Sequence, residues 1–135
     1  MVDRHGIPLA VTLSAANVHD SQMMEATVDA IPPIRQRRGR PRRRPAKLHG
    51  DKGYDFGVKR RALRARGIVP RLARRGIESK ERLGRHRWVV ERTHSWMNRF
   101  RRLKIRYERS AEVHIAFLEL GCALICWRSI QHGLC

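Results

Sequence analysis

Short apolar runs bounded by glycine, proline and polar residues mark the first half of the chain, and this pattern is typical of β-strands. The first residues fit the end of one strand, which a turn at Gly6 would close, because glycine accepts a positive φ. Three further runs, at residues 8–13, 46–49 and 68–72, predict three more strands. The run at 46–49 is short and apolar, so we expect it to be buried inside a sheet.

Helices are expected between and after these strands. Asp20 or Ser21 would cap the first helix, which Pro32 and Pro33 would stop, and Gly67 suits the residue that follows the end of the second. Apolar residues then recur at spacings of three and four between residues 89 and 103, which predicts an amphipathic third helix. The expected helices span residues 20–30, 54–67, 87–103 and 111–130, and the last looks largely buried.

This order of elements predicts an α/β fold with a mixed sheet flanked by helices. With 135 residues the chain has the length of one small domain, and a hydrophobic content of 41% is enough to form a core. Asp51 follows the strand expected at 46–49. Ligands bind at the carboxyl ends of strands in open α/β sheets, so we expect Asp51 to lie at a binding site.

The chain is strongly basic. It carries 30 Lys and Arg against 12 Asp and Glu, a formal net charge of +18, and arginine far outnumbers lysine. Arginine binds phosphate oxygens through two donors at once, which makes it the preferred reader of phosphate. A pI near 11.6 therefore indicates a polyanionic partner, most simply DNA or RNA, with binding that weakens as salt rises.

Arginine is densest within residues 31–46, where glycine and proline interrupt any helix, so we expect an exposed basic loop there. A solvated run of charge is the alternative interpretation, but so many like charges at close range favour contact with a polyanion. The arginines of this loop that we expect to bind DNA are Arg35, Arg37, Arg38, Arg40, Arg42, Arg43 and Arg44.

Cysteine content and apolar stretches indicate a cytoplasmic protein. The three cysteines do not form the framework of a small secreted protein, and the first residues do not have the pattern of a signal peptide. The longest apolar stretch, residues 115–127, contains Glu119 and reads as too short to span a bilayer. We therefore expect a reduced protein without a membrane segment.

Two acidic residues, Asp51 and Glu91, stand out against the basic background. Mg²⁺ is held by carboxylates together with waters and substrate phosphates, and phosphodiester cleavage commonly uses two such ions. One carboxylate at a strand end and one on a helix, with cations beside them for DNA, fit a site of this kind. The alternative is a surface ion pair between Glu91 and Arg87, one helical turn earlier.

Histidines and cysteines give further candidates for metal ligands. His49, two residues before the first of these acids, would be a ligand or, as the last residue of a buried strand, a packed side chain. Cys122 and Cys126 are one helical turn apart, with His114 and His132 on either side, but this spacing fits no common zinc pattern. Small buried cysteines in an apolar helix are the favoured interpretation.

Six short motifs follow one another along the chain. They are Gly-Ile-Pro-Leu at 6–9, Asn-Val-His-Asp at 17–20, Asp-Lys-Gly-Tyr-Asp at 51–55, Arg-Trp-Val-Val-Glu-Arg at 87–92, Trp-Met-Asn-Arg-Phe-Arg-Arg-Leu at 96–103 and Arg-Tyr-Glu-Arg at 106–109. In this order they resemble the C-terminal part of the catalytic domain of bacterial insertion-sequence DDE transposases, in the IS-four/IS-five-like group. The resemblance covers nearly the whole chain.

The resemblance implies that residues 1–135 are part of an RNase H-like catalytic domain. In this family an Asp, Asp, Glu triad binds two Mg²⁺ (or Mn²⁺) ions, cleaves DNA at the transposon ends and directs the freed 3′-OH at target DNA. The second Asp falls on Asp51 and the Glu on Glu91, so both are expected to be catalytic and to bind metal. Arg87 matches the family's signature arginine, whereas Gly84 and Asn98 depart from its tyrosine and lysine positions.

The resemblance also implies a gap. The family's first catalytic Asp lies on the strand before the one that opens this chain, so the sheet is expected to be N-terminally incomplete, with its first strand missing. The chain alone would then be inactive and would act with an upstream-frame N-terminal half, as a homo-oligomer when complete, on DNA in the nucleoid. Arg87 and Arg92 are expected to add DNA contacts. The alternatives are a non-enzymatic arginine-rich nucleic-acid-binding protein and an inactive transposase remnant.

Overall fold

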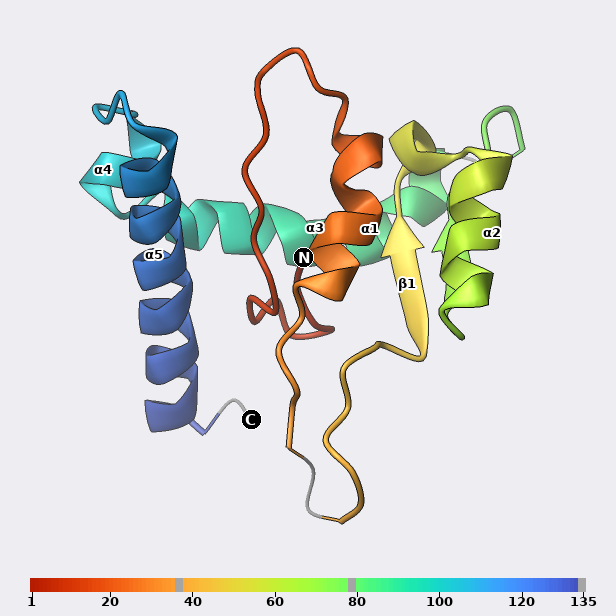
Figure 1. The fold of residues 1–135 in the computed structure, drawn as a ribbon, viewed down its shortest axis with the longest axis horizontal. Helices are drawn as coiled ribbons and strands as arrows, with labels where there is room; N and C mark the ends of the chain where they lie inside the picture. The colour runs from red at the N-terminus through yellow and green to blue at the C-terminus, as the bar shows by residue number, and fades with distance from the viewer. Residues whose placement is uncertain (36–37, 78–79, 134–135) are drawn as a thin grey trace. The chain divides into compact units, whose positions relative to one another are not determined.

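The computed structural model describes residues 1–35, 38–77 and 80–133, with the backbone alone for residues 80–87. The chain divides into two compact units: a helical unit, formed by Met1–Leu13 and Trp88–Cys135, and a sheet unit, Ser14–Arg87. The elements, of which Figure 1 labels the five α-helices and β1, are in chain order the 3-10 helix η1 (Asp20–Met23), α1 (Met24–Asp29), β1 (Lys47–Gly50), the 3-10 helix η2 (Lys52–Tyr54), α2 (Gly57–Ala65), β2 (Val69–Leu72), α3 (Lys80–Met97), α4 (Arg101–Lys104) and α5 (Ala111–Gln131).

The sheet unit is built on two parallel strands joined by a helix. β1 and β2 pair from Lys47 opposite Val69 to Gly50 opposite Leu72, and α2 connects them. α2 contacts both β2 and α1 (Figure 1). This strand–helix–strand order confirms the predicted α/β class, with a two-stranded parallel sheet among the described residues.

Alternation along the strands decides which side chains enter the core of the sheet unit. Leu48 and Leu72 are buried, and Leu63 of α2 and Ile68 are almost completely enclosed. Successive residues of a strand face opposite sides of the sheet, so the neighbours of these leucines fall on the other face. That face is exposed, and it carries Lys47, His49, Val69 and Arg71. The expectation of a fully buried strand is therefore wrong: only one face of β1 is buried.

The end of α2 agrees with the prediction from the sequence. Gly67 has a φ of +72°, the left-handed conformation that commonly follows a helix and that glycine accepts without strain. Its N–H donates to the carbonyl of Arg64, and the N–H of Ile68 donates to the carbonyl of Leu63. This reversal returns the chain into β2.

The helical unit packs α5 against the region where α3 ends and α4 begins. Gly121 on α5 is buried, and a Cβ at this position would lie 2.7 Å from Leu103 Cδ1 and 3.2 Å from Met97 Sδ. The absence of a side chain at Gly121 is therefore what allows α5 to approach its neighbours so closely. Ile125 and Ser129, one and two turns later, are buried as well.

Two of the predicted elements are wrong. Residues 8–13 form no strand, and the pairing near the N-terminus is a single antiparallel bridge between Val2 and Pro8. The helix predicted over 87–103 starts earlier and is divided: α3 ends at Met97, and Phe100 has an extended backbone, with φ −84° and ψ 114°, before α4 begins. The spacing of apolar residues continues through this break, so the pattern alone does not reveal it.

The last helix differs from its prediction in exposure and in length. α5 has 21 residues and is mostly exposed: only 17% of its most apolar 18-residue window is buried. By length and composition it could cross a membrane, with a mean hydropathy of 1.5, so the apolar segment is not too short for that. A single helix of this kind is weak evidence for a membrane protein, because core helices of soluble proteins have the same composition.

Two glycines of the sheet unit test its packing. A Cβ on Gly50 would lie 2.7 Å from Cδ2 of the buried Leu72, so Gly50→Ala is expected to lower the free energy of unfolding by about 1–3 kcal/mol. A Cβ on Gly57 would meet nothing closer than 3.8 Å, and its φ is not positive, so Gly57→Ala should be neutral or stabilise by about 0.5 kcal/mol. Urea unfolding followed by circular dichroism measures both changes, and equal effects would contradict this packing.

Candidate functional site

Asp51 lies where β1 passes into η2 and is the N-cap of that short helix. Its Oδ1 accepts a hydrogen bond from the N–H of Gly53 at 2.8 Å, and its backbone carbonyl accepts one from Tyr54 at 3.2 Å. The residue is exposed. One carboxylate oxygen is thus oriented by the backbone at a solvent-accessible strand end, an arrangement that suits cation binding.

Tyr54 lies close enough to both Asp51 and a second carboxylate, Asp20, for their charges to affect its phenol. η1 contacts η2, and the negative charges of Asp20 and Asp51 both act on the phenol of Tyr54. Burial is the larger cause that raises the pKa of Tyr54, and the two carboxylates raise it further. The structure therefore brings Asp20 into the neighbourhood of the Asp51 loop, and the motif at 17–20 is the signal in the sequence that points to it.

A hydrogen-bonded network around Asp55 fixes the loop that follows Asp51. Arg60 Nη2 donates to Asp55 Oδ1 at 2.6 Å and to the carbonyl of Leu72 at 3.0 Å. Arg75 donates its N–H to Asp55 Oδ2 at 2.9 Å and its Nε to the carbonyl of Lys52 at 3.1 Å. The bonds from Arg60 and then Arg75 hold the pKa of Asp55 below its usual value. The η2 loop is thereby tied to the end of β2.

Glu91 occupies the exposed face of α3. Ser95 and Asn98, the residue after α3, are exposed as well, whereas Thr93 is buried. The side chain of Arg87 is outside the described part of the chain, so its ion pair with Glu91 and its contact with DNA stay predictions.

Arg92, the neighbour of Glu91, is bound within the helical unit. Its guanidinium carbon lies 4.5 Å from the ring centroid of Trp88 and 4.9 Å from that of Trp96. Its Nη2 donates a hydrogen bond to the backbone carbonyl of His5. A guanidinium stacked on two indoles and bonded to a carbonyl has a structural role, because cation–π contacts of this kind stabilise packing. DNA contact by Arg92 stays a prediction.

Thr93 joins the same segment of α3 to the N-terminal turn. Its Oγ1 donates to the carbonyl of Gly6 at 2.7 Å, and a Cβ on Gly6, whose φ is +80°, would lie 3.0 Å from that hydroxyl oxygen. Asp3 Oδ1 closes the turn by accepting from the N–H groups of His5 and Ile7, each at 2.8 Å. The turn over residues 3–7 therefore holds the part of α3 that carries Glu91.

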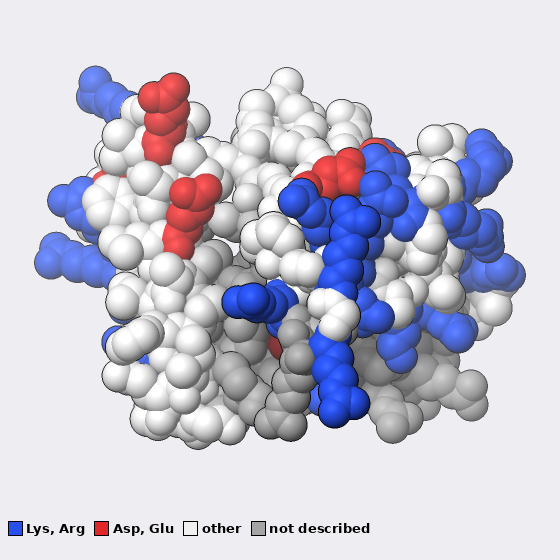
Figure 2. Space-filling model, turned by 60° about the horizontal axis from the view of Figure 1, so that its bottom comes forward, with Lys and Arg blue, Asp and Glu red and all other residues white. Residues whose placement is uncertain are grey.

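The described arginines of the basic loop are exposed, as predicted. An antiparallel bridge between Ile34 and Arg42 closes it, and Arg44 Nη1 donates to the carbonyl of Arg66 at 3.4 Å. On the face drawn in Figure 2, Lys and Arg side chains are more frequent than Asp and Glu side chains. Arg37 lies outside the described residues, and the exposed arginines of the loop are Arg35, Arg38, Arg40, Arg42, Arg43 and Arg44.

The other candidate ligands do not form a metal cluster within the described residues. No group of three or more His, Cys, Asp or Glu there is placed to hold a metal ion. His49 is exposed, so the expectation that it packs inside is wrong, and the reason is that Leu48 takes the inward position of β1. Cys122 and Cys126 are half-buried, and burial raises the pKa of the Cys122 thiol.

The two predicted catalytic residues lie in different units of the chain. Asp51 belongs to the sheet unit and Glu91 to the helical unit, and each unit is defined by its own contacts. Each unit carries one of these two carboxylates in an exposed position, Asp51 after β1 and Glu91 on α3. Their convergence on shared metal ions is therefore a prediction.

Comparison with known proteins defines the family. The family model of the transposase DDE domain matches residues 1–126, so this chain belongs to the DDE transposase domain family. Among curated proteins it is 53% identical, over 133 residues, to a Burkholderia cepacia protein provisionally named as the transposase for insertion sequence element IS402. The match covers 98% of this chain and 63% of that relative's length. No solved structure matches the chain.

The hydrogen bond from Thr93 to Gly6 can be tested by a pair of substitutions. Thr93→Val keeps the shape of the side chain but leaves the carbonyl of the buried Gly6 without its hydroxyl donor, so we expect a loss of about 1–3 kcal/mol in the free energy of unfolding. Thr93→Ser keeps the donor and should lose less. Urea unfolding curves compare the two variants, and a larger loss in the serine variant would contradict this role of the hydroxyl.

The network around Asp55 predicts a loss of stability in acid. Because the folded-state pKa of Asp55 is lowered, its contribution is present above the pKa of an unfolded aspartate, about 4, and is lost as the pH falls through the lower folded value. Asp55→Asn should therefore be less stable than the parent chain at neutral pH, and the difference should shrink toward pH 2. Urea midpoints measured across this range give the test, and a difference independent of pH would contradict it.

Proposed function

We propose that this chain is the C-terminal part of a transposase catalytic domain that cuts and joins DNA at the ends of an insertion sequence. The observation that carries the proposal is the family match over residues 1–126, which includes both carboxylates of the motifs. Asp51 follows β1 and Glu91 lies exposed on α3, positions from which carboxylates can reach a bound metal. The reaction class is metal-dependent phosphodiester cleavage followed by strand transfer.

The donor set of the chain suits Mg²⁺ or Mn²⁺. Both ions prefer carboxylate oxygens, and Asp51 and Glu91 supply them from exposed positions. The Gly53 N–H orients one oxygen of Asp51, and the Asp55 network keeps the surrounding loop in place. When bound, such ions would activate the attacking oxygen and stabilise the leaving oxygen of the phosphodiester.

The remaining residues of the proposed site hold the DNA and the α3 segment. The exposed arginines of residues 31–46 would neutralise phosphates close to the carboxylates. The turn over residues 3–7, through Thr93, would keep Glu91 at a fixed rotation about the α3 axis. We place the domain over residues 1–135, with an RNase H-like arrangement to which the parallel β1–β2 pair would belong.

The first carboxylate of the triad is proposed to come from outside these residues. The chain spans 63% of the length of the curated relative, and by resemblance no residue of this chain matches the first catalytic Asp. We infer that an N-terminal half, from the same or an upstream reading frame, supplies it and that the complete enzyme acts as a homo-oligomer on DNA in the nucleoid. The chain by itself is then inactive.

Metal-directed cutting of the polypeptide tests whether Asp51 and Glu91 share a site. Fe²⁺ with ascorbate and peroxide cuts a chain next to the place where iron binds, so the parent chain should be cut near both residues and Mg²⁺ should suppress both cuts. Asp51→Asn should weaken both cuts about 10- to 100-fold, as changes at metal sites commonly do. Glu112→Gln, which removes an exposed carboxylate of α5 that has no part in the proposed site, is the matched control.

The results separate the proposed enzyme from its alternatives. Cuts near only one of the two residues, or cuts that survive Asp51→Asn and Glu91→Gln, would contradict a shared metal site. If those variants also leave every DNA activity of the full-length transposase unchanged, the chain is an arginine-rich nucleic-acid-binding protein. DNA cleavage by the full-length parent and its loss in both variants would support the transposase.

A further inference from the structure

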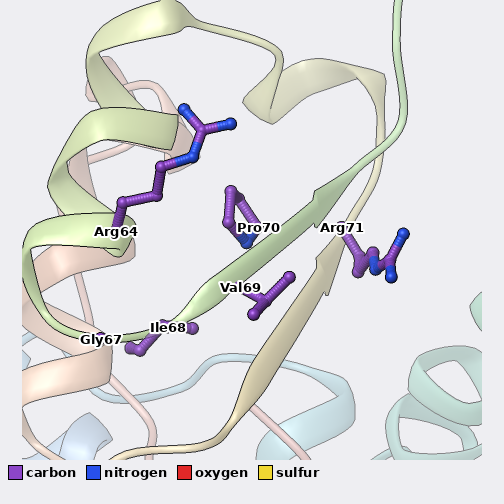
Figure 3. A pocket seen from close by; sticks show the side chains of 6 residues that line it. All are labelled: Arg64, Gly67, Ile68, Val69, Pro70 and Arg71. Carbon is purple, nitrogen blue, oxygen red and sulfur yellow. The ribbon is translucent and has the colours of Figure 1, made fainter.

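The outer edge of β2 forms an open hollow between arginines. Its volume is about 380 Å³, and Arg64, Gly67, Ile68, Val69, Pro70 and Arg71 line it. Figure 3 shows Arg64 rising from α2 on one side of the strand and Arg71 extending from β2 on the other. We propose that this edge, between Arg64 and Arg71, binds the sugar-phosphate backbone of DNA, as a contact separate from the basic loop. The inference rests on the proposed function, which supplies DNA as the partner.

The backbone of β2 makes this edge a poor partner for another strand. The N–H groups of Val69 and Ala73 point to β1, where they bond to the carbonyls of Ala46 and Gly50 at 2.9 Å. The outward positions are therefore residues 70 and 72. Pro70 has no N–H, and the Leu72 carbonyl already accepts from Arg60 at 3.0 Å. Pairing with a further β-strand would therefore lack the donor at residue 70 and would compete with Arg60 for the acceptor at residue 72.

The acidic residues around α2 leave the edge positive. Three acids form ion pairs with cations of α2 or of its C-cap: Glu25 with Lys59, Asp55 with Arg60, and Asp29 with Arg66. None of these six residues lines the hollow. Arg64 and Arg71, which do line it, are exposed and occur in no ion pair reported for the described residues. The positive charge at the edge therefore comes from the guanidinium groups of Arg64 and Arg71.

The shape of the edge suits a nucleic-acid backbone. A guanidinium donates two parallel hydrogen bonds to a phosphate, so the two arginines can each hold one phosphate group. The surface between them is apolar, with Val69 half exposed and Pro70 beside it, and can pack against a sugar. Contacts of this kind position a duplex without reading its sequence. Arg64 and Arg71 are thus positioned to add affinity for any DNA sequence.

The dependence of DNA binding on salt gives the test. Binding of the whole chain to a short mixed-sequence duplex is measured at several salt concentrations in EDTA, which removes metal. Each phosphate contact contributes about 0.9 to the slope of log K against log salt, so Arg64→Gln/Arg71→Gln should reduce that slope by about 2. Arg64→Lys/Arg71→Lys, which keeps the charge, should restore most of it. Circular dichroism confirms that each variant is folded.

A matched control separates this site from the effect of net charge. Arg99→Gln/Arg109→Gln removes the same charge from exposed residues of the helical unit and should leave the slope nearly unchanged. An equal fall in both double variants, or no fall in the first, would overturn the assignment. Stronger competition by single-stranded RNA than by duplex DNA would overturn DNA as the partner. Because EDTA excludes metal, a failure here leaves the shared metal site of Asp51 and Glu91 untouched, and the reverse also holds.

Discussion

Parallel pairing of β1 with β2 is the interaction on which the sheet unit depends. It forces the connection through α2, which buries Leu63 against the strands, and it requires Gly50 to approach Leu72 without a side chain. The pairing also ends at Gly50, so the chain leaves the sheet at that residue and Asp51 begins the next turn. The same ladder leaves the outer edge of β2 unpaired, where Pro70 and the arginines are found.

Arginine serves two different purposes in this molecule. Arg60, Arg66 and Arg92 are held by carboxylates, carbonyls or indole rings. Arg66 and Arg92 also join segments far apart in the sequence, through Asp29 and His5. The described arginines of residues 31–46 and those of the β2 edge are exposed and are the proposed phosphate contacts. A net charge of +18 counts both kinds alike. Burial and hydrogen bonding distinguish them, and for this reason Arg92, adjacent to a predicted catalytic residue, has a structural role in the fold.

Signals carried by a few neighbouring residues correctly predicted β1, β2 and the end of α2. The strands at β1 and β2 and the C-terminal glycine of α2 agree with the structure within a residue or two, because short apolar runs and a left-handed glycine act over a few residues. The break between α3 and α4 was not predictable, since Phe100 and Leu103 continue the helical spacing across it. The exposure of His49 and of α5 was also missed, because burial depends on which other segments pack against a face.

The sequence by itself determined the α/β order, the basic character, the exposed loop and the family motifs that contain Asp51 and Glu91. These follow from composition and from residues close together in the chain. Tertiary structure decided what holds those residues: Asp51 is fixed by the η2 cap and the Asp55–Arg60–Arg75 network, and α3 is joined to the N-terminal turn through Thr93 and Gly6. Those partners lie up to 87 residues apart in the sequence, and only folding brings such groups within hydrogen-bonding distance.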